Sequence, residues 1–194
     1  MFTPENTNKW LQNFAEKIET NHAYLSELDT PIGDADHGNN MVRGIEAMKL
    51  GLDKLTNPTL QDVFKTTAMA LISKVGGASG PLYGTAFLEM AKQSATTTEP
   101  ATLLSAALSG IKKRGGAIVG DKTMVDVWEP LVAKITTNEL TREDIDTSVE
   151  ATKDMQAKKG RASYLGERSI GHIDPGAMSS GYLFTALIET EGIL

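Results

Sequence analysis

Apolar residues recur at intervals of three and four along almost the whole chain. The clearest stripes cover residues 10–25, 41–52 and 103–111. These intervals place the apolar side chains on one face of an α-helix, whereas no segment alternates with the period of two that marks a half-buried strand. We therefore predict an all-α protein with about eight helices. The other candidate helices are 63–71, 82–90, 122–136, 142–159 and 178–191.

Short connections between these helices favour an antiparallel, up-and-down bundle. Thr59 and Thr141 are each followed three residues later by an acid, which is the pattern of a capped helix start. Pro130 lies inside a candidate helix and should kink it or displace its start. The chain contains no long linker and no convincing repeat. We expect a single domain, residues 1–194.

Composition narrows the class of protein. The net charge is −6, with acids and bases interspersed, so a broad surface for nucleic acid or anionic membranes is not expected. The absence of cysteine excludes disulfides, thiolate metal sites and cysteine nucleophiles. No apolar run approaches the roughly 20 residues that span a bilayer, and the N-terminus has no signal-peptide core. We expect a soluble cytoplasmic protein.

Glycine gathers in four places, 33–38, 76–84, 115–120 and 166–176, each at the junction of two predicted helices. In an antiparallel bundle, junctions separated by an even number of helices lie at the same end. These four junctions follow the first, third, fifth and seventh helices. They should therefore converge at one mouth of the bundle.

The first junction carries three carboxylates, Asp29, Asp34 and Asp36, within eight residues. Such a cluster costs Coulomb repulsion unless a cation lies among the acids. Oxygen ligands suit Mg²⁺ or Ca²⁺, but the late bidentate Glu of a calcium loop is missing, since Ile45 stands at that position. A polar loop with an Asp N-cap is the alternative. The neighbouring glycines, Asn39 and Asn40 favour a metal site.

The second junction, from Gly76 to Thr85, directly precedes an apolar helix. Its glycines allow backbone N–H groups to turn toward one point, Ser79 adds a hydroxyl, and Pro81 suits a first helical position. A loop of this kind at a helix N-terminus is an anion site, with a flexible turn as the alternative.

The third junction, from Gly115 to Thr123, is similar to a Walker A loop but departs from it twice. Asp121 intrudes between Gly120 and Lys122, and no strand precedes the loop. We reject a P-loop and expect Asp121 to cap the following helix and to contact a ligand.

The fourth segment, from Gly160 to Ala177, offers Arg161 and Arg168 as cations that could grip phosphate oxygens. Surface ion pairing is the alternative for each arginine. His37 and His172 could act as bases, and the alternative for both is a loop histidine that only makes hydrogen bonds.

Together the four segments closely resemble the nucleotide-binding L subunits of dihydroxyacetone kinases. The matching motifs are G-D-A-D-H-G-N-N-M, G-G-A-S-G-P-L-Y-G-T, G-D-K-T-M and G-R-A-S-Y-L-G-E-R-S-I-G-H-I-D-P-G-A. The resemblance extends from about residue 5 to the end of the chain. It implies a closed barrel of eight antiparallel helices, in agreement with the independent helix count.

The resemblance also implies a site. Its metal ligands would be Asp29, Asp34 and Asp36, chelating two Mg²⁺ ions that bridge the phosphates of a tightly bound ADP or ATP. No catalytic side chain is implied. The nucleotide-binding residues would be His37, Gly38, Asn39, Asn40, Ala78, Ser79, Gly115, Met124, Arg161, Asp174, Pro175 and Gly176.

A chain of 194 residues lacks the fused substrate half of ATP-dependent dihydroxyacetone kinases. It therefore resembles the phosphoenolpyruvate-dependent type, a phosphoenolpyruvate–glycerone phosphotransferase of the phosphotransferase system. That resemblance implies two partners: a DhaM-type subunit whose phosphohistidine converts bound ADP to ATP, and a DhaK-type subunit that holds dihydroxyacetone. A homodimer is left open.

Three other readings stay open. One is a related kinase domain for another acceptor, such as a fatty acid, although the C-terminal region usual in those proteins is absent. Another is a regulator that binds ADP in order to dock on a transcription factor. The third is a Ca²⁺-binding helical module, which would bind calcium without nucleotide.

Overall fold

The computed structural model describes residues 1–194 and contains helices joined by loops, with no strand. The all-α prediction is thereby confirmed. Two 3₁₀ helices, η1 (Thr152–Asp154) and η2 (Arg161–Ser169), lie between the last two α-helices. The α-helices are α1 (Pro4–Asp29), α2 (His37–Leu52), α3 (Leu60–Lys74), α4 (Ser79–Gln93), α5 (Pro100–Gly115), α6 (Val125–Thr136), α7 (Arg142–Ala151) and α8 (Pro175–Ile188).

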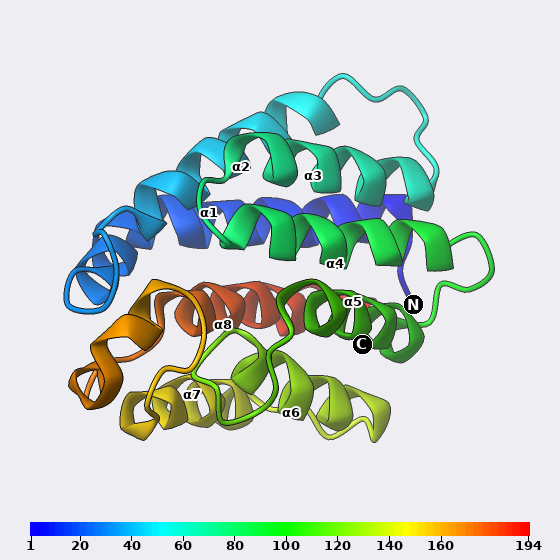
Figure 1. Ribbon diagram of the computed structural model, residues 1–194. Helices are drawn as coiled ribbons and strands as arrows, with labels where there is room; N and C mark the ends of the chain where they lie inside the picture. The colour runs from blue at the N-terminus through cyan, green and yellow to red at the C-terminus, as the bar shows by residue number, and fades with distance from the viewer.

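The eight α-helices form a closed ring. Each packs against the next one in the chain, and α8 returns to pack against α1. Figure 1 shows α1–α4 in the upper half of the molecule and α5–α8 in the lower half, with the loops that follow the odd-numbered helices toward the left of the view. The predicted closed barrel of antiparallel helices is confirmed.

Local sequence signals set the helix starts. Thr59 and Thr141 each accept a hydrogen bond from the backbone N–H three residues on, and the acid at that position bonds back to the threonine N–H. Both predicted capping boxes are therefore present, and Thr3 with Asn6 makes another at the start of α1. Pro130 lies inside α6 and does not displace its start.

Two predicted helices are longer than the real ones. The helix expected over 142–159 ends at Ala151, and residues 155–160 run as a loop beyond η1. The helix expected from residue 122 begins only at Val125, since Lys122 has a positive φ of 61° that a right-handed helix does not allow. In both cases the residues outside the helix belong to loops at the mouth of the barrel.

The core contains 42 buried apolar residues in one cluster. Four aromatic rings form its densest part, with Phe2 against Trp10 and Phe64, and Phe87 against the same two rings at centroid distances of 5.4 to 6.3 Å. The chain termini meet opposite the mouth, where the terminal ammonium donates to the carbonyl of Gly192. None of the helices is both long and apolar enough to cross a membrane.

Truncating the aromatic cluster should cost stability in proportion to the cavity that it leaves. We expect Phe87→Ala to lower the free energy of unfolding by about 3–5 kcal/mol, because the ring is fully buried. Tyr164→Ala is the matched control: its side chain is 88% exposed, so the change should stay within about 0.5 kcal/mol. Urea unfolding followed by circular dichroism measures both, and equal losses would contradict the packing described.

Candidate functional site

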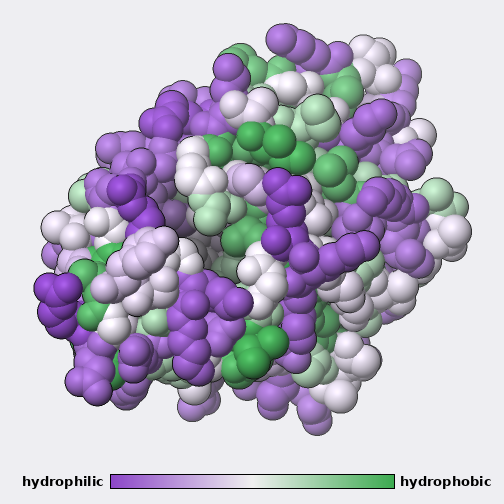
Figure 2. Space-filling view, in the orientation of Figure 1, coloured by the Kyte–Doolittle hydropathy of each residue, from purple (hydrophilic) through white to green (hydrophobic).

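The four loops that follow α1, α3, α5 and α7 enclose one cavity of about 590 Å³. Its volume lies within the range usual for small-molecule sites. Figure 2 shows a hollow on this face, with apolar and weakly polar surface inside and hydrophilic side chains around it. The predicted convergence of the junctions at one mouth is therefore what the fold produces. Gly166 and Gly171 do not line the cavity, whereas Gly160 does.

The three carboxylates of the first junction come together. Asp29 is the last residue of α1, and Asp34 and Asp36 follow in the turn before α2. One carboxylate oxygen from each lies within 4.8 Å of the others. Asp29 is buried, and its Oδ2 accepts from the backbone N–H groups of Asp36 at 3.0 Å and His37 at 3.3 Å.

Gly33 makes this geometry possible. Its N–H donates to the Asp29 carbonyl at 2.6 Å, and a Cβ at this position would lie 2.0 Å from Asp29 Oδ1. A larger residue would push the carboxylate out of the cluster. The turn therefore requires glycine for close approach and not for backbone conformation.

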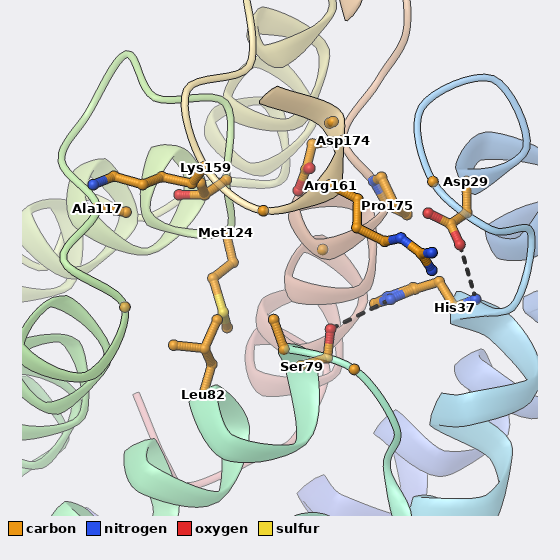
Figure 3. A pocket seen from close by; sticks show the side chains of 18 of the residues that line it. Asp29, His37, Ser79, Leu82, Ala117, Met124, Lys159, Arg161, Asp174 and Pro175 are labelled. Carbon is orange, nitrogen blue, oxygen red and sulfur yellow. Dashed lines mark hydrogen bonds between the residues drawn. The ribbon is translucent and has the colours of Figure 1, made fainter. Parts of the chain in front are cut away.

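The cluster suits a hard divalent cation. Its donors are carboxylate oxygens only, and Asp34 and Asp36 remain accessible from the cavity. The one cation that the protein itself supplies there is the guanidinium of Arg161, which pairs with Asp34. Figure 3 shows Arg161 reaching from its loop across the cavity toward Asp29 and His37. Three clustered carboxylates with a single side-chain counter-ion leave negative charge that a metal ion could neutralise.

The N-terminus of α4 forms the opposite wall. The N–H groups of residues 77–80 donate to no acceptor in the protein, and Ser79 also lines the cavity. Gly80 permits the tight turn, since a Cβ there would lie 2.3 Å from the Val75 carbonyl oxygen. Free N–H groups at the positive end of a helix dipole favour an anion.

The far end of the cavity carries apolar side chains, with Lys159 beside them (Figure 3). Leu82 and Met124 point toward each other there, with Ala117 on the neighbouring loop (Figure 3). The cavity thus has a charged end, at the three aspartates, and an apolar end, at Leu82 and Met124.

The third junction differs from the prediction in the role of Asp121. Its carboxylate accepts from Ile118 N–H at 3.0 Å within the loop, and α6 has no side-chain cap. Asp121 does not line the cavity. The expectation that Asp121 caps the helix is wrong, and its contact with a ligand stays a prediction. Asp126 instead holds the loop, accepting from the N–H groups of Gly120 and Thr123.

Lys122 has a role that the sequence did not reveal. Its side chain is 2% exposed, and its ammonium donates to the carbonyl oxygens of Thr152, at 2.8 Å, and Met155, at 3.1 Å, and to that of His172. Burial lowers the pKa of Lys122. The ammonium joins the third loop to both ends of the segment that carries Arg161.

Burial shifts two ionisable groups in the wall. The pKa of Asp174 is raised to about 7, mainly by burial of its carboxyl and despite the hydrogen bond from Ala177 N–H at 2.8 Å. Burial lowers the pKa of His37 to about 4, and the nearby Asp36 only partly opposes the shift. The His37 imidazole is therefore neutral near pH 7 and is unsuited to take up a proton there.

Most of the residues that the resemblance implied face this cavity, but some do not. Gly38 lies against the His22 carbonyl in the α1–α2 contact, and Asn39 is exposed on the outer side of α2. Arg168 is also exposed and lies outside the cavity wall. The implied residues that line the cavity are Asp29, Asp34, Asp36, His37, Asn40, Ala78, Ser79, Gly115, Met124, Arg161, Asp174, Pro175 and Gly176.

Sequence reasoning also missed part of the wall. Leu82 and Ile111 look like ordinary members of apolar stripes, and they line the cavity because they stand in the turn of the helix nearest the mouth. Arg114 and Lys159 add cationic side chains. Their position directly beside glycine-rich loops is the one signal that could have indicated them.

Comparison with known proteins agrees with the fold and the motifs. The DAK2 domain family matches residues 31–189. The chain is 51% identical over 189 residues to the ADP-binding subunit of the PTS-dependent dihydroxyacetone kinase of Lactococcus lactis, covering 97% of this chain and 98% of that protein. It is 41% identical over 194 residues to the ADP-binding subunit of the PEP-dependent dihydroxyacetone kinase of Escherichia coli, covering 92% of each.

A solved structure shares the architecture. The dihydroxyacetone kinase of C. freundii, crystallised with AMP-PNP and Mg²⁺, superposes with a TM-score of 0.76 over 94% of this chain and 33% of that one. At 23% identity this likeness concerns the fold alone. The family match and the two bacterial relatives carry the assignment. The chain therefore belongs to the DAK2-domain family and, within it, to the dihydroxyacetone kinase L subunits that its motifs resemble.

Proposed function

We propose that this chain is the ADP-binding subunit of a phosphoenolpyruvate-dependent dihydroxyacetone kinase. It would act as one nucleotide-binding domain that keeps ADP or ATP with two Mg²⁺ ions while a phosphoryl group passes through. The observation that carries the proposal is the placement of three clustered carboxylates opposite the unpaired N–H groups of α4, in one open cavity.

The charged end of the cavity would hold the diphosphate. Asp29, Asp34 and Asp36 would ligate the metal, which when bound neutralises phosphate charge and aligns the phosphates. The N–H groups of residues 77–80 would donate to phosphate oxygens. Arg161 would exchange its pairing with Asp34 for a phosphate oxygen once metal charge replaces it at the carboxylates.

The apolar end would hold the base and sugar. Leu82 and Met124 offer apolar surface for a flat ring (Figure 3). Gly176 lies close to Met124, since a Cβ added there would be 3.9 Å from the Met124 Cβ. The backbone of Gly115 lies close to the Leu82 side chain, since a Cβ added at Gly115 would be 3.1 Å from it. Together the two ends match a ligand with one charged and one flat, weakly polar part.

The chain supplies no nucleophile for the transfer. Both ring nitrogens of His37 lie against serine hydroxyls, and Lys122 is bonded to three carbonyl oxygens. Phosphoryl transfer depends on positioning and charge stabilisation, so none is required. The donor phosphohistidine and the acceptor hydroxyl would both reach the nucleotide through the open mouth, from the M-type and K-type partner subunits.

Reconstitution tests the whole proposal. Purified chain, mixed with a phosphohistidine donor subunit and a substrate subunit, should convert dihydroxyacetone to its phosphate and should carry label from phosphoenolpyruvate through bound ATP. Label that stops at ATP would instead support the regulatory reading. Transfer to a fatty acid in place of dihydroxyacetone would support the related kinase. Either result would overturn the proposal.

Removal of one carboxylate should abolish nucleotide retention. We expect Asp34→Ala to lower the Mg²⁺-dependent affinity for ADP by more than about tenfold, because it deletes a metal ligand from an exposed turn. Helicity should not change. Asp146→Ala, on the exposed face of α7, is the control. Isothermal titration with and without EDTA measures the effect, and a variant that still carried ADP through gel filtration would contradict it.

Two arginines of one segment allow a matched comparison. We expect Arg161→Ala to weaken ADP binding about tenfold or more, as loss of a charge-assisted hydrogen bond would, and Arg161→Lys to recover only part of it. Arg168→Ala should leave the affinity unchanged because Arg168 lies outside the cavity wall. Equal losses at the two positions would point to a general charge effect and would argue against a phosphate contact at Arg161.

A further inference from the structure

A line of buried side-chain hydrogen bonds joins the barrel core to the cavity. It starts at Trp128 of α6, passes through Ser180 and Ser179 of α8 with Tyr83 of α4 between them, and ends at His37 of α2. The successive distances are 3.1 Å from Trp128 Nε1 to Ser180 Oγ, 2.9 Å from Ser180 Oγ to Tyr83 Oη, 2.8 Å from Tyr83 Oη to Ser179 Oγ, and 3.0 Å from Ser179 Oγ to His37 Nε2.

The chemistry of the groups gives this line a direction. The indole N–H of Trp128 can only donate, so Ser180 accepts from it. Ser180 has no acceptor within reach other than Tyr83 and therefore gives its own hydrogen to the phenol oxygen. The phenol hydrogen is then left for Ser179, since Tyr83 bonds to these two serines alone. Burial keeps the phenol protonated by raising the pKa of Tyr83.

Ser179 has one hydrogen to donate and two acceptors within reach. His37 Nε2 lies at 3.0 Å, and the Gly176 carbonyl, one turn back in the same helix, lies at 3.2 Å. Ser179 accepts from Tyr83 and still has its own hydrogen to donate, and the ring nitrogen is the nearer of the two acceptors. No carboxylate bonds to the imidazole, since Asp29 accepts only from the His37 backbone.

We infer that Tyr83 and Ser179 are positioning residues that fix His37 in the tautomer with hydrogen on Nδ1. That nitrogen faces the cavity and lies 3.4 Å from Ser79 Oγ, as the dashed line in Figure 3 marks. The Ser79 hydroxyl then accepts from His37 and keeps its own hydrogen for a ligand. The other tautomer would draw that hydrogen onto Nδ1 and turn oxygen lone pairs toward the cavity.

The effect of this tautomer on ligand binding rests on the proposed function. A hydroxyl held as a donor beside the free N–H groups of α4 suits a phosphate oxygen, whereas lone pairs at the same place would repel it. The order of donors and acceptors is thus set by Trp128 in the core, and it determines at the mouth whether the Ser79 hydroxyl donates or accepts.

Nitrogen NMR of the nucleotide-free and metal-free protein decides between the tautomers. The chain has three histidines, His22, His37 and His172, so ¹⁵N-histidine labelling gives a spectrum simple enough to assign with His22→Gln and His172→Gln. Long-range ¹H–¹⁵N correlation identifies the nitrogen that carries the hydrogen. We expect Nδ1–H for His37, and a spectrum showing Nε2–H would overturn the inference.

Tyr83→Phe removes one link and keeps the ring in the core. Ser179 then loses its donor, so we expect the His37 hydrogen to move to Nε2 in a large share of molecules and ADP affinity to fall roughly three- to tenfold. Tyr182→Phe is the matched control, because Tyr182 lies on the same helix, three residues after Ser179, and its hydroxyl makes no bond in the line. An unchanged tautomer in Tyr83→Phe would overturn the inference.

A double-mutant cycle separates this role from general destabilisation. Since Tyr83 acts through Ser179, we expect Tyr83→Phe combined with Ser179→Ala to weaken ADP binding no more than Ser179→Ala does alone. Additive losses would contradict action through one line. If the wild-type protein bound no ADP, the proposed function would fail, while the tautomer measured without ligand would still decide the inference.

Discussion

The direction of the helices in a closed ring governs the site. Since neighbours alternate, α2, α4, α6 and α8 all begin at the same end of the barrel, and each brings the positive end of its dipole there. The protein carries a net charge of −6 and places three carboxylates at that same mouth. Converging helix N-termini, with Arg161, offset part of this negative charge and leave the remainder for a cation.

Closure of the ring also divides the molecule along its length. At the end where the termini meet, aromatic rings of α1, α3 and α4 pack against one another, and the one polar group among them, the Trp10 indole N–H, donates to the Leu183 carbonyl. Toward the mouth, the core admits hydroxyls, an indole N–H and an imidazole, all hydrogen-bonded. The aromatic cluster and the candidate site therefore lie at opposite ends of the barrel, and the same helices run between them.

The sequence predicted the helices well and the interior of the mouth less well. Periodicity and capping report on contacts within one helix, so Thr59 and Thr141 were identified correctly. The capping role expected of Asp121 was wrong and the exposed position of Asn39 was not foreseen, because both depend on loop geometry and helix facing, which spacing does not encode. Lys122 was missed because its three carbonyl acceptors lie 30 to 50 residues away.

By itself, the sequence determined the all-α class, the alternation of helices and the gathering of glycine and aspartate at one set of junctions, because these depend on intervals of a few residues. Only the tertiary structure decided which of these residues face the cavity and which acids share a cation-sized space. It also decided which hydrogen bonds connect the core to Ser79. Those features depend on distances between segments far apart in the chain, and packing of the whole ring sets them.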